Sequence, residues 1–239
     1  MQRYFGSVIG NQVLLKDDDV FHLTRVMRAK PGDQIEVVSD NQVFLCEVRT
    51  FKPLAIYVLD KIKENNELKN DVILISALLK GEKMDLVLQK ATELGVSEIV
   101  LLQTERTIAK IKKDEQELKF ERYRKILKEA AEQSKRSKIP ALYRLFDIRQ
   151  LSEIDADVKM IAYEGEEGPS ESFYKLVHSI DGKKKVAIII GPEGGFSENE
   201  VVLAGNAGFE KVSLGRRILR AETASFYALS VIANYLERK

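Results

Sequence analysis

The sequence contains a single cysteine and no long run of apolar residues. Because Cys46 has no second cysteine to pair with, an internal disulfide is excluded. No apolar stretch approaches the roughly 20 residues that a helix needs to cross a bilayer. The N-terminus, MQRYFGSVIG, also lacks the apolar core of a secretory signal. We therefore expect a cytoplasmic protein with no membrane partner.

The composition is that of a folded globular protein. Apolar residues make up 44% and charged residues 31% of the 239 positions, as is usual for globular domains. This length is sufficient for two hydrophobic cores. The polar stretch KENNELKN at 63–70 separates two kinds of sequence pattern. It predicts one domain over 1–68 and a second over 69–239.

The first domain is predicted to hold a small antiparallel sheet. Three β-rich runs, 34–40, 43–51 and 54–62, are separated by turn residues. In the second run Phe44, Cys46 and Val48 alternate with Leu45, Glu47 and Arg49, so we expect the side chain of Cys46 in the core of that sheet and assign it no chemistry.

A short helix is predicted before this sheet. It follows three aspartates that suit a helix N-terminus, and the pair Pro31-Gly32 ends it. Its spacing places Val20, Leu23 and Met27 on one side.

The second domain alternates strands with helices. Continuous apolar strands such as 186–190 are typical of a parallel sheet that is covered by helices on both faces. The fold class is therefore α/β, with a small β-domain in front.

Charge is unevenly distributed along the chain, although the net charge is only +1. Residues 106–149 carry fourteen basic and seven acidic side chains, a local excess of +7, whereas 150–180 carry two basic and seven acidic. A basic segment of this kind is typical of a polyanion-binding face. The alternative is an ordinary solvated helix with mixed charge.

The stretch GPEGGFSENE follows a buried strand and leads into a helix, where many α/β proteins bind phosphate. It lacks the Gly-Lys-Ser/Thr ending of a phosphate-binding loop, and it lacks the G-x-G-x-x-G dinucleotide pattern. Glu193 lies among its glycines, and a carboxylate there would repel phosphate. We expect an uncharged or cationic ligand held through backbone groups; the alternative is a tight turn with no ligand.

A second stretch, LGRRILRAETA at 214–224, also connects a strand to a helix. It crowds Arg216, Arg217 and Arg220 around an apolar pair. Ligands of open α/β sheets bind at the carboxyl ends of the strands, and both stretches lie at such ends. The alternative for these arginines is ion pairing with Glu193 or Glu222.

Together, GPEGGFSENE, LGRRILRAETA, KEAAEQSKR, LLKGEKMDLVLQKATELGV, MQRYF and FHLTRVMRAKPGD resemble the bacterial 16S ribosomal RNA uracil-N3-methyltransferases of the SPOUT superfamily. The resemblance covers nearly the whole chain. It implies a C-terminal α/β domain with a trefoil knot, which periodicity alone could not justify. It also implies an N-terminal PUA-like β-barrel that helps to hold RNA, S-adenosyl-methionine (SAM) as cofactor, and a homodimer.

The resemblance places the cofactor against three loops, 162–165, 191–194 and 214–220. Within them the expected cofactor-binding residues are Tyr163, Glu164, Gly191, Pro192, Glu193, Gly194, Leu214, Gly215, Ile218 and Leu219. SAM has no phosphate and carries a positive sulfur, so the absent lysine and the nearby carboxylates are consistent with it. No metal is expected.

Methylation of uracil N3 develops negative charge on the ring carbonyl oxygens, which an arginine would stabilise. The candidates are Arg220 and Arg217, with Glu222 as a base or as a partner that orients an arginine. Both histidines are poor candidates for the base, because His22 lies in the first domain and His178 in an ordinary amphipathic helix.

The partner of such an enzyme is 16S ribosomal RNA or the small ribosomal subunit. Phosphate contacts are expected from a set of basic residues: Arg25, Arg28, Lys30, Lys83, Lys128, Lys135, Arg136 and Lys138. The family often has paired histidines where this chain has Phe21-His22, so no role is carried over to the first of them.

The last helix, 222–237, is apolar around most of its circumference. Such a helix is buried, either in the core of its own chain or, as the resemblance implies, in a dimer interface.

Two other functions remain open at this stage. One is methylation of another RNA site, such as a ribose 2′-hydroxyl. The other is a ribosome assembly factor that keeps an inactive cofactor fold, which the intact GPEGG and RILRAETA motifs disfavour.

Overall fold

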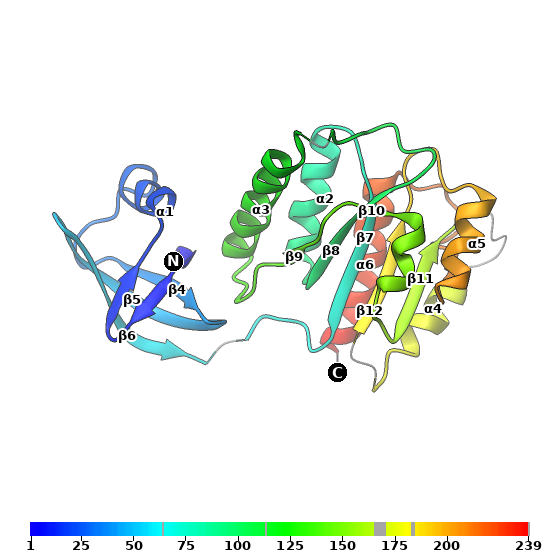
Figure 1. Cartoon of the computed structure of the whole chain (residues 1–239). Coiled ribbons are helices and arrows are strands. Elements are labelled where there is room, and N and C mark those ends of the chain that lie inside the picture. The colour runs from blue at the N-terminus through cyan, green and yellow to red at the C-terminus, as the bar shows by residue number, and fades with distance from the viewer. Residues whose placement is uncertain (64, 113, 165–170, 183–184, 239) are drawn as a thin grey trace. The chain divides into compact units, whose positions relative to one another are not determined.

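The structure is a computed structural model of the whole chain (Figure 1). It describes residues 1–63, 65–112, 114–164, 171–182 and 185–238.

The chain divides into two compact units. The first contains residues 1–67 and 131–138, and the second contains 68–130 and 139–239. The predicted boundary after residue 68 lies one residue from the observed one. The segment 131–138 belongs to the first unit, although it is distant from the rest of that unit in sequence.

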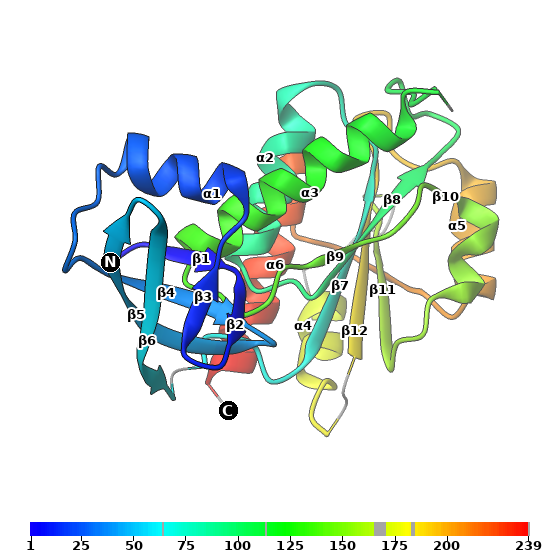
Figure 2. The ribbon, with the colours of Figure 1, turned by 60° about the vertical axis from the view of Figure 1, so that its left-hand side comes forward.

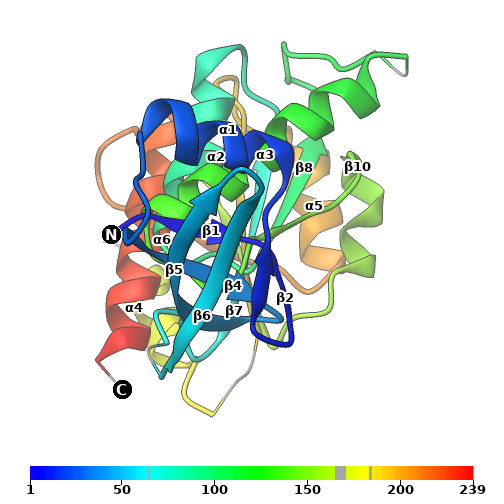
Figure 3. The same cartoon turned by 90° about the vertical axis from the view of Figure 1, so that its left-hand side faces the viewer.

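The first unit contains a six-stranded sheet (Figure 3) in the order β1-β4-β5-β6-β3-β2. β1 runs parallel to β4, and the other pairings are antiparallel. The strands are β1 (Arg3–Phe5), β2 (Ser7–Ile9), β3 (Gln12–Leu14), β4 (Gln34–Ser39), β5 (Gln42–Phe51) and β6 (Leu54–Ile62). The last three are the predicted runs, and Cys46 is buried in the core of this sheet.

The helix before β4 differs from the prediction. It begins as α1 (Asp17–Phe21) and continues as a π-helix, η1 (His22–Val26). Leu23 is buried, as its spacing predicts, but Met27 is 49% exposed. The π-helix bonds each residue to the fifth one along the chain, which rotates Met27 away from the side that Leu23 occupies.

Segment 131–138 is held in the first unit by charged contacts. Arg136 pairs with Glu67 at 2.6 Å, and Lys135 pairs with Glu36 at 2.8 Å. Arg3, buried beside them, bonds Glu36 at 2.8 Å. Burial alone would raise the pKa of Glu36, but hydrogen bonds from Lys135 and Arg3 outweigh it and hold that pKa below its usual value.

The second unit contains a seven-stranded sheet in which every pairing is parallel. Its order is β10-β8-β7-β12-β11-β13, with β9 paired to β8. The strands are β7 (Asp71–Ala77), β8 (Glu98–Gln103), β9 (Ala141–Leu142), β10 (Phe146–Asp147), β11 (Val158–Ala162), β12 (Lys185–Ile190) and β13 (Glu210–Val212). This confirms the predicted parallel sheet.

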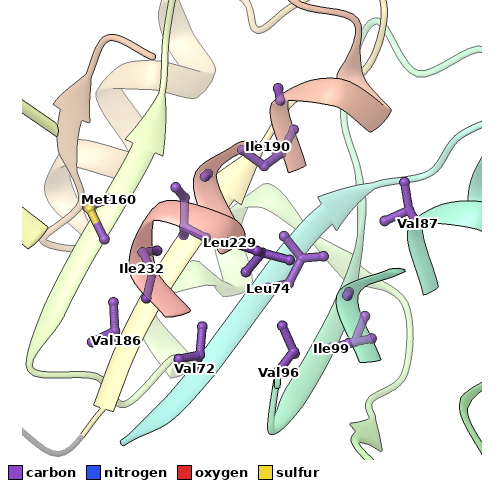
Figure 4. Close-up of a cluster of buried hydrophobic side chains, with 14 of the residues drawn as sticks. Val72, Leu74, Val87, Val96, Ile99, Met160, Val186, Ile190, Leu229 and Ile232 are labelled. Carbon is purple, nitrogen blue, oxygen red and sulfur yellow. The ribbon is translucent and has the colours of Figure 1, made fainter. Parts of the chain in front are cut away.

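Helices cover both faces of this sheet (Figure 2). Successive residues of β7 alternate between two cores: Val72 and Leu74 face one, and Ile73 and Ile75 face the other. Figure 4 shows the first core, where Leu229 and Ile232 of α6 approach the strands. The first core is covered by α2 (Glu82–Glu93), α3 (Gln116–Gln133), α4 (Glu171–His178) and α6 (Ala221–Glu237), and the second by η2 (Ile148–Glu153) and α5 (Glu198–Asn206).

The end of the chain returns across the sheet. β12 lies between β7 and β11, both of which precede it, and β13 lies beyond β11. The chain then returns to α6, which packs against α2 and β12. A return of this kind is required by the expected knot, which itself stays a prediction of the resemblance.

Candidate functional site

A pocket lies where β11, β12 and β13 end, within the second unit. The three loops that follow these strands and the first turn of α6 surround a space of about 640 Å³, which includes the open mouth. Its lining residues are Ala162, Tyr163, Glu164, Ile190, Gly191, Pro192, Gly195, Phe196, Ser213, Leu214, Gly215, Arg217, Ile218, Leu219, Ala221 and Ala224. The pocket therefore forms at the sheet edge that the sequence predicts.

The loop after β12 takes a shape that requires glycine at two positions. A Cβ at Gly191 would lie 2.8 Å from a ring carbon of Phe196. Gly195 has a φ of +66°, in the left-handed region that favours glycine, and its N–H donates to the carbonyl of Pro192 at 3.0 Å. The loop thus turns back on itself, and backbone and the Phe196 ring line the pocket.

The helix that follows this loop is capped by side chains. Ser197 and Glu200 form a reciprocal capping box at the start of α5, in which each side chain accepts a hydrogen bond from the other residue's backbone N–H. Glu200 is buried, and its second oxygen accepts the N–H of Glu105 at 2.7 Å. One carboxylate therefore joins the loop after β12 to the loop after β8.

The loop after β8 makes a second contact with the glycine loop. Arg106 donates to the carbonyl of Gly194 at 3.1 Å, and the hydroxyls of Thr104 and Thr107 lie 2.6 Å apart beside it. Sequence reasoning missed this loop and Glu200. The Ser-x-x-Glu spacing of the capping box was the available signal for Glu200, whereas the loop after β8 carries no motif.

The two glutamates of the predicted cofactor loops take different positions. Glu193 pairs with Lys83 of α2 at 2.8 Å and does not line the pocket. The hydrogen bond from Lys83 lowers the pKa of Glu193, and the same bond raises the pKa of Lys83. Glu164 does line the pocket, and its Oε1 would lie 3.4 Å from a Cβ at Gly195. Of these two carboxylates, only Glu164 lines the pocket.

The three arginines of 214–220 are exposed. Among the residues that the structure describes, no hydrogen bond or ion pair reaches the guanidinium of Arg216, Arg217 or Arg220. The alternative of pairing with Glu193 is wrong, because Glu193 pairs with Lys83. Pairing with Glu222 is not observed either: one oxygen of that carboxylate, Oε2, is buried with no hydrogen-bond partner in the described part of the chain.

Arg220 and Glu222 lie near the ion pair of the glycine loop. The charge of Glu222 raises the pKa of Lys83, and the charge of Arg220 lowers it, although both effects are smaller than that of Glu193. Two cations, Lys83 and Arg220, and two carboxylates, Glu193 and Glu222, therefore lie beside the pocket. They belong to the glycine loop and to the starts of α2 and α6.

Most of the predicted cofactor residues line the pocket. Those that do are Tyr163, Glu164, Gly191, Pro192, Leu214, Gly215, Ile218 and Leu219, together with the predicted catalytic residue Arg217. Glu193 and Gly194 do not, and Gly165 lies outside the described residues. The lining residues that were missed belong to the strand ends, the glycine loop and the first turn of α6: Ile190, Gly195, Phe196, Ser213, Ala221 and Ala224.

The predicted RNA-binding residues fall into two groups. Arg25, Arg28, Lys30 and Lys138 are exposed in the first unit, and Lys128 is half-buried in the second. Lys135 is tied to Glu36. Arg136 is 2% exposed and pairs with Glu67, so its prediction as a phosphate contact is wrong: its guanidinium is used inside the first unit.

Two searches bear on other partners. No helix in the described part of the chain is long and apolar enough to cross a membrane. Within the same residues, no group of three or more histidine, cysteine, aspartate or glutamate side chains is arranged to hold a metal ion.

Two family models match the chain. One is described as an RNA methyltransferase domain and covers residues 66–233; the other is described as an RNA methyltransferase PUA domain and covers 15–54. The ribosomal RNA small subunit methyltransferase E of Bacillus subtilis (strain 168) is 35% identical over 250 residues, which cover 99% of this chain and 98% of that protein.

Two similar structures were solved with a cofactor. A methyltransferase from Legionella pneumophila in complex with bound SAM has a TM-score of 0.88 at 32% identity, covering 98% of this chain and 97% of its own. A ribosomal RNA small subunit methyltransferase E from Neisseria gonorrhoeae, bound to S-adenosyl methionine, has a TM-score of 0.87 at 27% identity with the same coverage.

The fold and the pocket therefore define a class, an RNA methyltransferase domain accompanied by its PUA domain. Within that class, the chain belongs to the family of ribosomal RNA small subunit methyltransferase E.

Proposed function

We propose that this protein transfers the methyl group of SAM to N3 of a uridine in 16S ribosomal RNA. The observation that carries the proposal is the three-loop pocket, which has glycine backbone and apolar walls but lacks the Gly-Lys-Ser/Thr ending of a phosphate-binding loop. The names of the relatives support the RNA substrate, and the two cofactor complexes support SAM.

The pocket suits SAM in both charge and shape. Leu214, Ile218 and Leu219 supply apolar walls for an adenine ring, and Ile218 is 85% exposed. Glu164 supplies a negative charge in the pocket, which favours a positively charged sulfur. Because Lys83 already neutralises Glu193, we assign the sulfonium to Glu164.

SAM, when bound, supplies an electrophilic methyl group, and its sulfur keeps the electron pair of the broken S–C bond. The uridine must lose its N3 proton for the nitrogen to attack. Glu222 is suited to accept that proton, because its Oε2 is buried without a partner among the described residues. Arg220 directly precedes α6, and its guanidinium has no partner among the described residues. It is suited to donate to the carbonyl oxygen where negative charge develops. Arg217 lines the pocket and is the second candidate.

The proposed RNA contacts are phosphate contacts, which position the substrate without reading its bases. Arg136 is left out of this set because its guanidinium is buried against Glu67. The proposed phosphate contacts are Arg25, Arg28, Lys30, Lys83, Lys128, Lys135 and Lys138. Lys83 and Lys135 would have to exchange their carboxylate partners for phosphate. RNA affinity should fall steeply with added salt, and affinity that is flat from low to high salt would contradict these contacts.

We also propose a homodimer. Most apolar residues of α6 are buried in their own chain against α2, α4 and β12, which explains much of the apolar pattern of this helix. Phe226 and Tyr227 remain partly exposed, Tyr227 by 39%. A second copy would cover them. Light scattering at micromolar concentration should give twice the mass of one chain, and the mass of a single chain would contradict the proposal.

One experiment tests the function as a whole. The protein is incubated with labelled SAM and either unmodified small ribosomal subunits or naked 16S RNA, and the methylated nucleoside is then identified and located. N3-methyluridine at one position is the expected product. Label on a ribose 2′-hydroxyl would mean a different RNA methyltransferase, and absence of label from both substrates would contradict the proposal.

A further inference from the structure

The outer side of the helical turn at the start of the first unit exposes three large apolar side chains. Phe21 is 62% exposed, Val26 59% and Met27 49%. Single exposed apolar residues are common on protein surfaces and need no explanation. Three of them within seven consecutive residues, including an aromatic ring, form a patch of the kind that marks an interaction site.

The π-helix gathers these side chains. The N–H of Met27 donates to the carbonyl of His22, five residues earlier, at 2.9 Å. Residues five apart therefore lie about one turn apart along η1, so Val26 follows Phe21 by about one turn on the same side of the helix. Short π-helical turns occur frequently at functional sites.

The inner side of the same turn fixes the patch in place. Leu23 is 1% exposed and belongs to the core of the first unit. Beside it, the hydroxyl of Tyr4 and Nδ1 of His22 lie 2.9 Å apart. The buried side of this turn therefore fixes the position of the exposed patch. The patch does not have to rearrange before a ligand binds.

Cations flank the patch. Arg25 and Arg28 are exposed, and within residues 1–63 and the rest of the described chain no hydrogen bond or ion pair holds either guanidinium. Arg28 has a φ of +52°, a conformation that is uncommon for residues other than glycine. Lys30 follows, also exposed, whereas the exposed Asp17 and Asp18 lie at the opposite end of the turn. The positive charge is therefore concentrated where Val26 and Met27 are.

We infer that Phe21, Val26 and Met27 form a stacking platform for an unpaired base of RNA, with Arg25 and Arg28 on the adjoining phosphates. An aromatic ring next to unpaired arginines matches the two features of a single strand, flat bases and a charged backbone. A duplex offers neither base faces nor an open major groove to side chains. This goes beyond the proposed function, in which these arginines contact phosphate only.

The chain contains no tryptophan, which permits a local test. The variant Phe21→Trp keeps an aromatic platform and places the only fluorescent indole at the patch. We expect its emission to be quenched by a single-stranded RNA of about ten nucleotides, and much less by a duplex of the same length. The control is Ile9→Trp, which replaces an equally exposed apolar residue of the same unit; its emission should not respond.

Affinity measurements complete the test. Phe21→Ala should weaken single-strand binding about 5- to 150-fold, the value of one stacked base, without changing the salt dependence. Arg25→Ala should reduce the slope of affinity against salt by about one phosphate contact. Ile9→Ala should leave both unchanged, and thermal melting should show that all three variants fold.

Three results would overturn the inference: equal quenching by single strand and duplex, no quenching of Phe21→Trp, or wild-type affinity of Phe21→Ala. Binding of a second protein copy, seen as quenching that depends on protein concentration without RNA, would also overturn it. The outcome is independent of the methylated position. Quenching of Phe21→Trp by single-stranded RNA, together with methyl transfer to another nucleoside, would contradict only the proposed function. Methylation of uridine N3 without such quenching would contradict only the stacking platform.

Discussion

Two basic stretches of this chain look alike in sequence and differ in the structure. In 135–138 of the first unit, Arg136 is buried against Glu67 and Lys135 is tied to Glu36. In 214–220 of the second unit, Arg216, Arg217 and Arg220 are exposed, with no partner among the described residues. The first stretch uses its charge to hold a segment in the fold, whereas the charges of the second are exposed.

A count of basic residues does not tell which of them are paired inside the fold and which are exposed. Residues 106–149 have the largest positive excess, yet part of that charge is neutralised inside the first unit by acids from distant parts of the chain. A free cation is more informative than a paired one, because its charge has no structural use that explains it. The predictions below compare the two stretches.

The largest effect is expected for Arg220→Ala. If this arginine stabilises charge in the reaction, methyl transfer in a single turnover should slow about 100- to 1,000-fold, while SAM affinity and the free energy of unfolding remain those of the wild type. Labelled SAM and quenched-flow sampling measure the rate. Arg216→Ala, which removes a neighbouring exposed charge that does not line the pocket, is the matched control. Unchanged turnover in Arg220→Ala would remove this residue from the mechanism.

The paired stretch should respond in stability. Glu67→Gln removes the negative charge beside the buried Arg136, and breaking such a pair costs about 3 kcal/mol or more. Urea denaturation should show this loss as a lower midpoint, with the pocket's SAM affinity preserved at low denaturant. The comparison variant is Arg217→Ala, which should leave the midpoint unchanged. Equal midpoints for Glu67→Gln and the wild type would mean that this ion pair does not hold the segment.

Acid should weaken the first unit through Glu36. The pKa of this carboxylate is lower in the folded protein than its ordinary value of 4.5, so the unfolded state binds more protons. The stabilisation is present above pH 4.5 and is lost as the pH falls through the lowered pKa. Denaturation midpoints between pH 7 and pH 3 should fall more in the wild type than in Glu36→Gln. An identical acid dependence in the two proteins would rule out this contribution.

The smallest effect is expected for Lys83→Met. The side chains of Lys83 and Glu193 are 40% and 32% exposed, and exposed ion pairs contribute little. SAM affinity, measured by calorimetry, should therefore change by no more than about fivefold. If Lys83 instead contacts phosphate, RNA affinity should fall at low salt and its salt dependence should become shallower.

Much of the architecture was predictable because local pattern and final environment agree. The run 186–190 is apolar throughout, and it forms β12, which is buried between two neighbouring strands. Strands β1, β2 and β3 have three residues each, too few to show a period of two. The position of Met27 was wrong because a π-helix shifts the phase of a pattern read with an α-helical period.

The pocket was predictable for a different reason. Glycine allows the backbone to come close to a ligand. Gly191 and Gly215 both line the pocket. Whether Glu164 or Glu193 faces the ligand depends on Lys83, which lies 110 residues away in the chain, and no local pattern carries that information. The same holds for Arg136, whose partner Glu67 is 69 residues away.

The most direct test of the central claim, that the pocket takes a nucleoside cofactor without phosphate, is calorimetric titration of SAM beside ATP. We predict one SAM site per chain and no measurable ATP binding, because the glycine loop lacks the Gly-Lys-Ser/Thr ending of a phosphate-binding loop and Glu164 lines the pocket. ATP binding with an affinity equal to that of SAM would contradict it.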